Sequence, residues 1–447
     1  MASQERQRDT QHSPGVGNHG RYYDSCDDGI NPNLPFQHLA GLRSLSLVNT
    51  DSDEDSDGLR VPLHCHTPEH PSFHRQLGCM GSSLTSLKLH SIELSSISSD
   101  WRFLSSLTSL EHLDLQQAPA ERGSSMVFEG SQSGLGGALP ALSHLTRLRL
   151  EWQIDSTIKL ALGMLTQLQE LRLHACGEGF FEAADADSRL NLPHSLTHLD
   201  VKLSQDYDEI CAPDLASLTA LQHLQLQDAE GLDVGMMSGM ARLTHLQLCM
   251  APNTFDDACM MQLLDVLSDS QQLRHLQLEF CNDDSLQHSM VAEQLLRQCS
   301  ALTASSHLTS LQLSGVRLPA ACGEALFPAD HFMPHLTTLK LRGRAKCWWH
   351  HPTAHGSGGE FIGCWRDIDR LIECCPSLID LDLAGLVQRG VDMSELRHLW
   401  RLTSLVVSGK SVDDDCAEGL AQLTQLRVLT VIDPAKGRAG PPYCQSH

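Results

Sequence analysis

Leucines recur along this chain in one short pattern, Leu-x-x-Leu-x-Leu, in which apolar and polar positions alternate over the last four residues. The pattern occurs fourteen times between Leu42 and Val431, with valine at the last position in three units. The alternation places the two final apolar side chains on one face of a strand and the residue between them on the other. Units repeated at such a period predict a solenoid in which each strand stacks on the next. The units begin at Leu42, Leu84, Leu110, Leu145, Leu168, Leu196, Leu221, Leu243, Leu273, Leu308, Leu336, Leu378, Leu402 and Leu426.

The spacing of the units predicts where the solenoid carries insertions and helices. Most units begin 22 to 30 residues after the one before, and four gaps of 35 or 42 residues are longer. Because loop closure costs little more for a long loop than for a short one, these gaps predict surface insertions near 49–80, 117–138, 282–304 and 342–365. A doubly wound sheet would need longer helical crossovers and fewer strands, so we reject it. Apolar residues at helical spacing predict helices at Ala258–Leu267, Met290–Cys299, Ile368–Cys374 and Cys416–Leu423.

Fourteen such units in succession, over about residues 34–433, resemble the leucine-rich repeat family. The resemblance implies an α/β horseshoe with parallel strands on its concave face and helices, 3-10 turns or loops on its convex face. Cys374-Cys375-Pro376 resembles the cysteine-containing subclass, and other units resemble short irregular repeats. Family members commonly carry Asn or Cys three residues after the last leucine, where the side chain bonds to backbone. Only Cys176 and Cys281 fit here, so that ladder is expected to be mostly missing and the curvature uneven.

Composition and charge indicate the cellular location and exclude some classes of partner. Residues 1–33 and 434–447 are polar, contain several Gly and Pro, and are expected to be disordered. A polar start, the lack of an 18-residue apolar run and sixteen cysteines read as reduced thiols predict a cytoplasmic protein with no membrane insertion. We also expect a monomer. The formal charge of −23 argues against nucleic acid as a partner. The 25 histidines make the net charge sensitive to acid, which leaves a pH-sensing role or a compositional bias open.

The outward strand positions carry the candidate chemistry. Stacked parallel strands lie about 4.8 Å apart, so residues at the same position of successive units form columns. The histidines before the middle leucine and the polar residues after it predict a hydrogen-bonding strip on the concave face that binds a protein partner. The histidines are His112, His198, His223, His245 and His275, and the adjoining polar residues are Asp200, Gln225, Gln247 and Gln277. The competing interpretation is that one ancestral His-Leu-Gln-Leu unit was copied without a function.

Other features of the strip are ambiguous. Arg147, Arg149 and Arg172 form a basic patch that could receive a carboxylate, although Glu151 and Glu170 could neutralise it. Four histidines in a line offer no tetrahedral closure, so a metal in the column is not expected. Beyond the histidines, the outward positions become mixed, for example at Asp380 and Asp382.

Two loops contain residues that resemble binding sites. Cys347-Trp348-Trp349-His350-His351 has zinc-ligand residue types but no standard spacing, so Trp348 and Trp349 are better candidates for a partner contact. Asp53-Glu54-Asp55 begins like a calcium loop, but His64 stands where a bidentate Glu is needed. We therefore expect a solvated acidic loop there, and no metal or cofactor.

No enzyme motif emerges from the chain. Gly409-Lys410-Ser411 lacks the earlier glycine of a phosphate loop, because Ser404 stands there. The sequence therefore predicts a non-catalytic protein-interaction scaffold. The alternative is a substrate-recognition or regulatory subunit of an enzyme complex, such as a ubiquitin ligase adaptor. The family also includes cytoskeletal and axonemal adaptors, which gives the cytoskeleton or ciliary axoneme as a second expected location.

Overall fold

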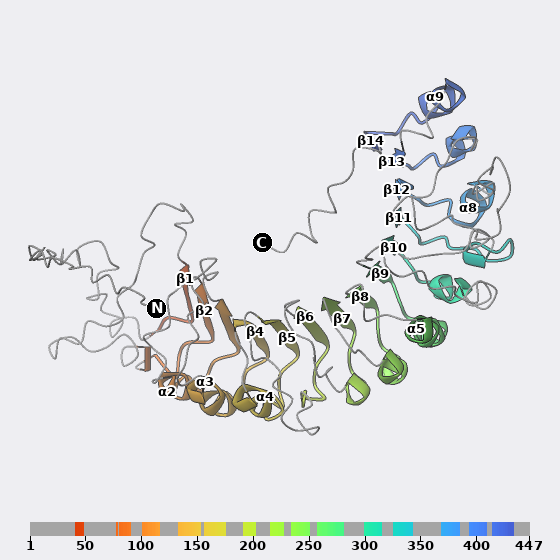
Figure 1. Cartoon of the computed structure of the whole chain (residues 1–447). Helices are drawn as coiled ribbons and strands as arrows, with labels where there is room; N and C mark the ends of the chain where they lie inside the picture. The colour runs from red at the N-terminus through yellow and green to blue at the C-terminus, as the bar shows by residue number, and fades with distance from the viewer. Residues whose placement is uncertain are drawn as a thin grey trace, which may run out of the picture.

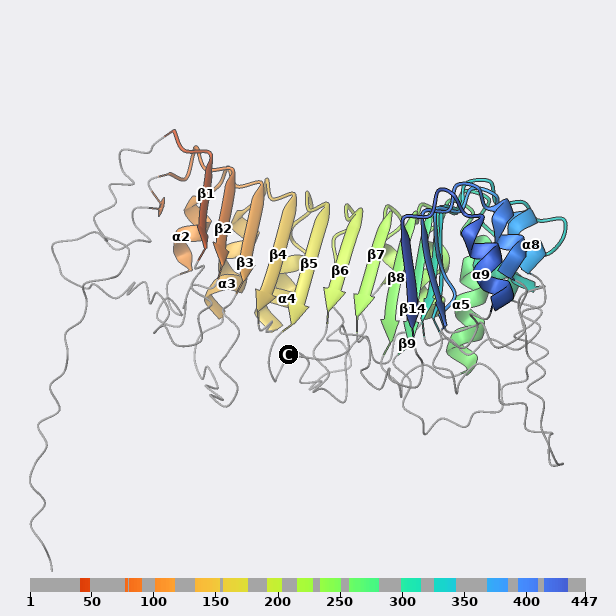
Figure 2. The ribbon, with the colours of Figure 1, turned by 90° about the horizontal axis from the view of Figure 1, so that it is seen from above.

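The alternating units form strands that stack in the order in which they occur in the sequence. The computed structural model describes residues 41–48, 77–78, 80–90, 101–116, 133–152, 156–175, 191–202, 215–227, 234–250, 257–280, 299–314, 325–342, 368–384, 393–408 and 414–432. Within these residues, one parallel sheet of fourteen strands runs from β1 to β14 without a crossover. Figure 1 shows the strands along the inner side of an arc, and Figure 2 shows them side by side with a common direction. The predicted solenoid, with strands on the concave face, is confirmed.

Each strand begins at the residue before the middle leucine of its unit. The strands are β1 Ser44–Val48, β2 Ser86–His90, β3 His112–Gln116, β4 Arg147–Trp152, β5 Glu170–Ala175, β6 His198–Lys202, β7 His223–Gln227, β8 His245–Met250, β9 His275–Phe280, β10 Ser310–Ser314, β11 Thr338–Arg342, β12 Asp380–Asp382, β13 Ser404–Ser408 and β14 Val428–Ile432. Neighbouring strands pair with no register shift, so that the middle leucines of successive units lie next to one another at every step, as in Leu199↔Leu224↔Leu246.

The leucines form one continuous core between the sheet and the convex side. From β2 to β13, the two inward residues of every strand are at most 2% exposed, and the first leucine of each of these units is at most 3% exposed. The core is open at the far end, where Leu429 and Val431 of β14 are 46% and 50% exposed because no further unit among the described residues covers them. Each unit therefore depends on the next to bury its leucines.

Short helices and 3-10 turns cover the convex side (Figure 1). Three of the helices predicted from apolar spacing are confirmed as α5, α8 and α9, whereas most of Met290–Cys299 lies outside the described residues. The turn before Leu110 contains a five-residue helix, α2, that its short apolar spacing did not predict. The elements are α2 Arg102–Ser106, α3 Ser133–Ala138, η3 Leu139–Ala141, α4 Ser156–Leu162, η4 Leu215–Ser217, η5 Val234–Gly239, α5 Asp257–Asp269, η6 Cys299–Thr303, α8 Ile368–Cys374, η7 Met393–His398 and α9 Asp414–Ala421.

A threonine ladder ties successive units together at the edge where the chain enters the strands. In Leu-Thr-x-Leu units, the threonine hydroxyl donates to the backbone carbonyl of the corresponding residue in the unit before. That carbonyl also accepts two backbone N–H groups: Gln222 O accepts from Thr244 N at 2.8 Å and His245 N at 3.0 Å. The hydroxyl bonds measure 2.9 to 3.3 Å and come from Thr85, Thr146, Thr197, Thr244, Thr309, Thr337 and Thr403. A side-chain ladder thus exists, but at the opposite end of the strands from the expected asparagine position.

Candidate functional site

The four predicted histidines form a column across β6 to β9. The register aligns His198, His223, His245 and His275 as direct neighbours, each at the first position of its strand. Their ring centroids are 5.7, 5.1 and 4.2 Å apart in this order, and the first and last pairs are stacked. The side-by-side arrangement expected from the copied spacing is therefore present. We call these four residues the histidine column.

A second row of polar side chains runs beside the histidine column. Asp200, Gln225, Gln247 and Gln277 are aligned two residues further along the same strands. The fifth predicted histidine, His112, does not join the column, because Arg147 and Glu170 occupy the same position on the two strands between it and His198. The binding role of both rows remains a prediction.

The sequence interpretation missed a third row. The residue after the last leucine of each unit also faces the concave side, because the strand continues for one more alternation. Register aligns these residues as His90, Gln116, Glu151, His174, Lys202, Gln227, Cys249, Glu279, Ser314 and, on β11, Arg342. The signal was present in the sequence, since the period of two extends past the final leucine.

Carboxylates pair with all three arginines of the predicted basic patch. Glu170 lies 2.8 Å from Arg172 and 3.6 Å from Arg147, measured between the closest charged atoms. Arg149 lies 3.7 Å from Glu151 and 4.0 Å from Asp114. A docking carboxylate would have to displace these partners, so the arrangement favours the neutralised interpretation of the patch.

Contacts between His174 and two carboxylates extend this network diagonally towards the histidine column. His174 lies between two strands, with Nδ1 3.9 Å from Glu151 and Nε2 3.6 Å from Asp200. The concave face therefore divides into two zones. β3 to β6 carry paired charges, and β6 to β10 carry mostly uncharged hydrogen-bonding groups.

The surroundings of His223, His245 and His275 favour the neutral form of these three rings. Partial burial lowers the pKa of His223, and the neighbouring His198 lowers it further. Burial followed by the adjacent His275 lowers the pKa of His245 to about 4. For His275, burial and then Arg274 lower the pKa. Neighbouring imidazolium rings would also repel one another, so the pKa values of His223 and His245 lie below the usual range for histidine.

Acidification is expected to destabilise the protein through this column. The folded-state pKa of His245 lies below the roughly 6.5 of an unfolded histidine, so the unfolded chain takes up the proton first as the pH falls. Stability is thus intact above pH ~6.5 and is lost as the pH falls towards the folded pKa. Between pH 7.5 and pH 5, the free energy of unfolding of a His245→Gln variant should fall by roughly 1 kcal/mol less than that of the unmodified protein. This figure allows for solvent screening of the half-exposed ring.

The measurement is thermal unfolding followed by circular dichroism across this pH range. His307→Gln, in an exposed turn, is the matched control and should leave the pH profile unchanged. Identical pH profiles for His245→Gln and the unmodified protein would show that the column does not set this dependence.

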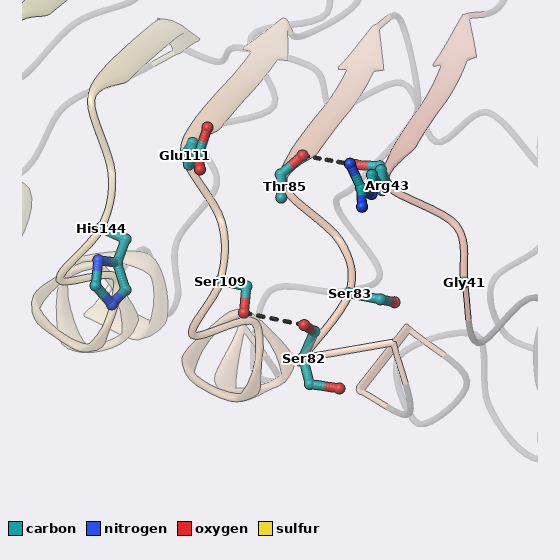
Figure 3. Close-up of a pocket in the computed structure, with 8 residues that line it drawn as sticks. All are labelled: Gly41, Arg43, Ser82, Ser83, Thr85, Ser109, Glu111 and His144. Carbon is teal, nitrogen blue, oxygen red and sulfur yellow. Dashed lines mark hydrogen bonds between the residues drawn. The ribbon is translucent and has the colours of Figure 1, made fainter.

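A shallow polar pocket lies at the strand-entry edge near the first units. Its volume is ≈ 570 Å³, and Arg43, Thr85, Glu111 and His144 are among its lining residues. Figure 3 shows the hydroxyl of Thr85 directed at Arg43 and that of Ser109 at Ser82, which are the bonds to the backbone carbonyls of those residues. The pocket is several strands from the histidine column, and these two hydroxyls already donate within the chain. We therefore place the candidate site on the concave face.

The part of the chain that the structure describes offers neither a metal-ligand cluster nor a helix that could span a membrane. No group there of three or more His, Cys, Asp or Glu residues is placed to hold a metal ion. None of the described helices has the length and apolar character that crossing a membrane requires. Trp348, Trp349 and the acidic segment at Asp53 lie outside the described residues.

Comparisons with known proteins add only distant similarities. No protein-family model and no curated protein matches the sequence. An internalin from Listeria monocytogenes is 19% identical, with 80% of this chain and 88% of that chain covered and a TM-score of 0.46. A leucine-rich repeat protein of Leptospira interrogans is 16% identical, with 90% and 85% covered and a TM-score of 0.45. The ectodomain of a membrane receptor kinase from Arabidopsis thaliana, in complex with Casparian strip integrity factor 2, is 16% identical, with 80% and 45% covered and a TM-score of 0.32.

Because these TM-scores are below 0.5, the assignment rests on the chain itself. Fourteen Leu-x-x-Leu-x-Leu units each form one strand, and the strands make a single parallel sheet in sequence order over a leucine core. By its own repeats and topology, the chain is a leucine-rich repeat solenoid.

Proposed function

We propose that this protein is a non-catalytic interaction scaffold that binds a protein partner on the concave face of its solenoid. The observation that carries the proposal is the mostly uncharged zone from β6 to β10. The histidine column and the glutamines beside it lie in register across consecutive strands. Side chains held at fixed spacing on a rigid sheet supply many weak and directional contacts, which suit a protein surface.

The solenoid supports this function in a second way. Its strands share one core, so that the positions of the concave side chains are fixed before a partner arrives, and little order is lost on binding. The proposal includes the cytoplasmic location expected from the sequence. No observation on the described residues favours a ligase adaptor over a general scaffold.

Replacing His223, His245 and His275 together with alanine is expected to weaken partner capture at least tenfold, which corresponds to about 1.4 kcal/mol of binding free energy. The melting temperature at pH 7.5 should change little, because the three rings lie on the concave face outside the leucine core. Affinity purification of the tagged full chain from its own cells, followed by crosslinking mass spectrometry, measures both capture and the location of the contact.

The matched control is the triple alanine variant of His144, His307 and His335. These three exposed histidines precede strands at the entry edge, away from the column. Control and unmodified protein should capture the partner equally. Crosslinks confined to the convex helices would overturn the proposal, and an unfolded column variant would show that the histidines serve the fold instead.

A further inference from the structure

The threonine ladder fixes the proton position in three of the four rings of the histidine column. The hydroxyl of Thr244 donates to the carbonyl of Gln222 at 3.0 Å, and the same oxygen lies 2.9 Å from Nδ1 of His245. A carbonyl can only accept, and a hydroxyl has one hydrogen to give. Nδ1 of His245 must therefore carry the proton and donate to Thr244. In the neutral ring this leaves Nε2 as an acceptor.

The same argument applies to two more members of the column. Thr197 gives its hydrogen to Gln169 O at 3.1 Å and lies 2.9 Å from Nδ1 of His198, so Nδ1 is again the donor. Thr309 gives its hydrogen to Arg274 O at 2.9 Å and lies 3.4 Å from Nε2 of His275, which makes Nδ1 the acceptor there.

The acceptor nitrogen of His245 is available to a partner. Nε2 of His245 receives no hydrogen bond from any described residue. It is also not among the described side-chain atoms that are both buried and without a hydrogen-bond partner, so solvent reaches it. The lowered pKa of His245 and His275 keeps these rings neutral at pH 7.5, so that the lone pairs persist. Charged groups next to the column are few and of both signs: Glu170, Arg172, Asp200, Lys202, Arg274 and Glu279.

The spacing of the column selects the geometry of the partner. Successive ring centroids are 5.7, 5.1 and 4.2 Å apart. An α-helix repeats one face about every 5.4 Å. An extended strand repeats one face only every ~6.6 Å, twice its rise per residue. The repeat distance of a helix laid across the strands therefore matches the ring spacing of the column better than the repeat distance of an extended peptide does.

Resting on the proposed scaffold function, we propose that the histidine column is a row of hydrogen-bond acceptors that receives a partner α-helix carrying donor side chains once per turn. Lysine, arginine, asparagine and glutamine have suitable donors. The overall charge of −23 favours lysine and arginine among them, because it attracts a cationic segment.

Three synthetic alanine-based helical peptides test the partner chemistry. One carries lysine at i, i+4, i+7 and i+11, the second carries the same lysines spread around the helix, and the third carries glutamate in the striped positions. Fluorescence anisotropy with the full chain at pH 7.5 should show the striped lysine peptide binding about tenfold more tightly than the spread one, the gain of roughly one hydrogen bond to a charged donor. The glutamate peptide should not bind.

A single substitution tests the role of the ladder. Thr244→Val removes the oxygen that holds Nδ1–H of His245 and should reduce the preference for the striped peptide several-fold. In ¹⁵N NMR, His245 should change from the Nδ1–H tautomer to a mixture, and Thr244→Ser should restore both properties. Thr337→Val is the matched control, because Thr337 makes the same ladder bond, to Thr309 O at 3.1 Å, without a histidine beside it.

Equal binding of striped and spread lysine peptides, or an Nε2–H tautomer at His245 in the unmodified protein, would overturn this inference. That failure is distinct from failure of the scaffold function. If the cellular partner still crosslinks to the concave face, the scaffold stands and only the chemistry of its partner is wrong.

Discussion

Replacing Leu224 with alanine is expected to lower the free energy of unfolding by about 3 kcal/mol, the usual cost of a cavity in a closed leucine core. Leu224 is 0% exposed, and the register places it between Leu199 and Leu246. In a solenoid each unit is stabilised mainly by its two neighbours. The cavity therefore weakens two contacts between units at once, in the middle of the stack.

Chemical denaturation followed by circular dichroism measures this loss. Gln225→Ala is the matched control, because it removes a side chain of similar length from the next position on the same strand, on the concave face. It should change the unfolding free energy by less than about 0.5 kcal/mol. Equal losses from the two variants would contradict the one-sided core.

The second large effect is expected at Asp382, where alanine should cost roughly 2–3 kcal/mol. The side chain is 0% exposed. One of its oxygens accepts the backbone N–H of Ala384 at 3.0 Å, and the other accepts Nε of Arg342 at 2.6 Å. Alanine leaves the partly buried N–H of Ala384 without its acceptor and removes the partner of a guanidinium. Asp382→Asn keeps an acceptor for Ala384 and should lose less.

Asp380, on the same strand β12, provides the comparison. It pairs with Lys340 at 3.1 Å, but the two side chains are 27% and 30% exposed. Exposed ion pairs contribute little, so Asp380→Ala should cost less than about 1 kcal/mol in the same denaturation experiment. If Asp380→Ala and Asp382→Ala lower the free energy of unfolding equally, burial of the Asp382 carboxylate does not determine its contribution to stability.

Some features of the fold and site could be predicted because they repeat. The Leu-x-x-Leu-x-Leu spacing is copied from unit to unit, so the strands, their order and the alignment of the histidines follow from counting residues. Three helices of the convex side also follow from apolar spacing. The third concave row could have been predicted in the same way, because the alternation of inward and outward residues continues to the residue after the last leucine.

Other features could not be predicted, because they depend on side-chain conformations between units. Asp382 occupies an outward position in the pattern, which predicts an exposed side chain. In the structure its carboxylate is buried and pairs with Arg342 of the unit before. Likewise, Glu151 and Glu170 were recognised as neighbours of the arginines, yet the sequence alone left open whether they pair with them. The hydrogen-bonding role of the threonines could not be predicted either, since their acceptors are backbone carbonyls of another unit.

The sequence by itself determined the repeated scaffold: one strand per unit, a leucine face and a polar face, and a column of histidines in register. Periodicity suffices for these because burial of leucine is non-directional and acts alike in every unit. The tertiary structure alone decided which carboxylates pair, which charge is buried and which histidine nitrogen carries the proton. Those outcomes depend on hydrogen-bond distances and directions between residues more than 20 positions apart, such as Thr244 and Gln222, and a pattern of residue types does not contain them.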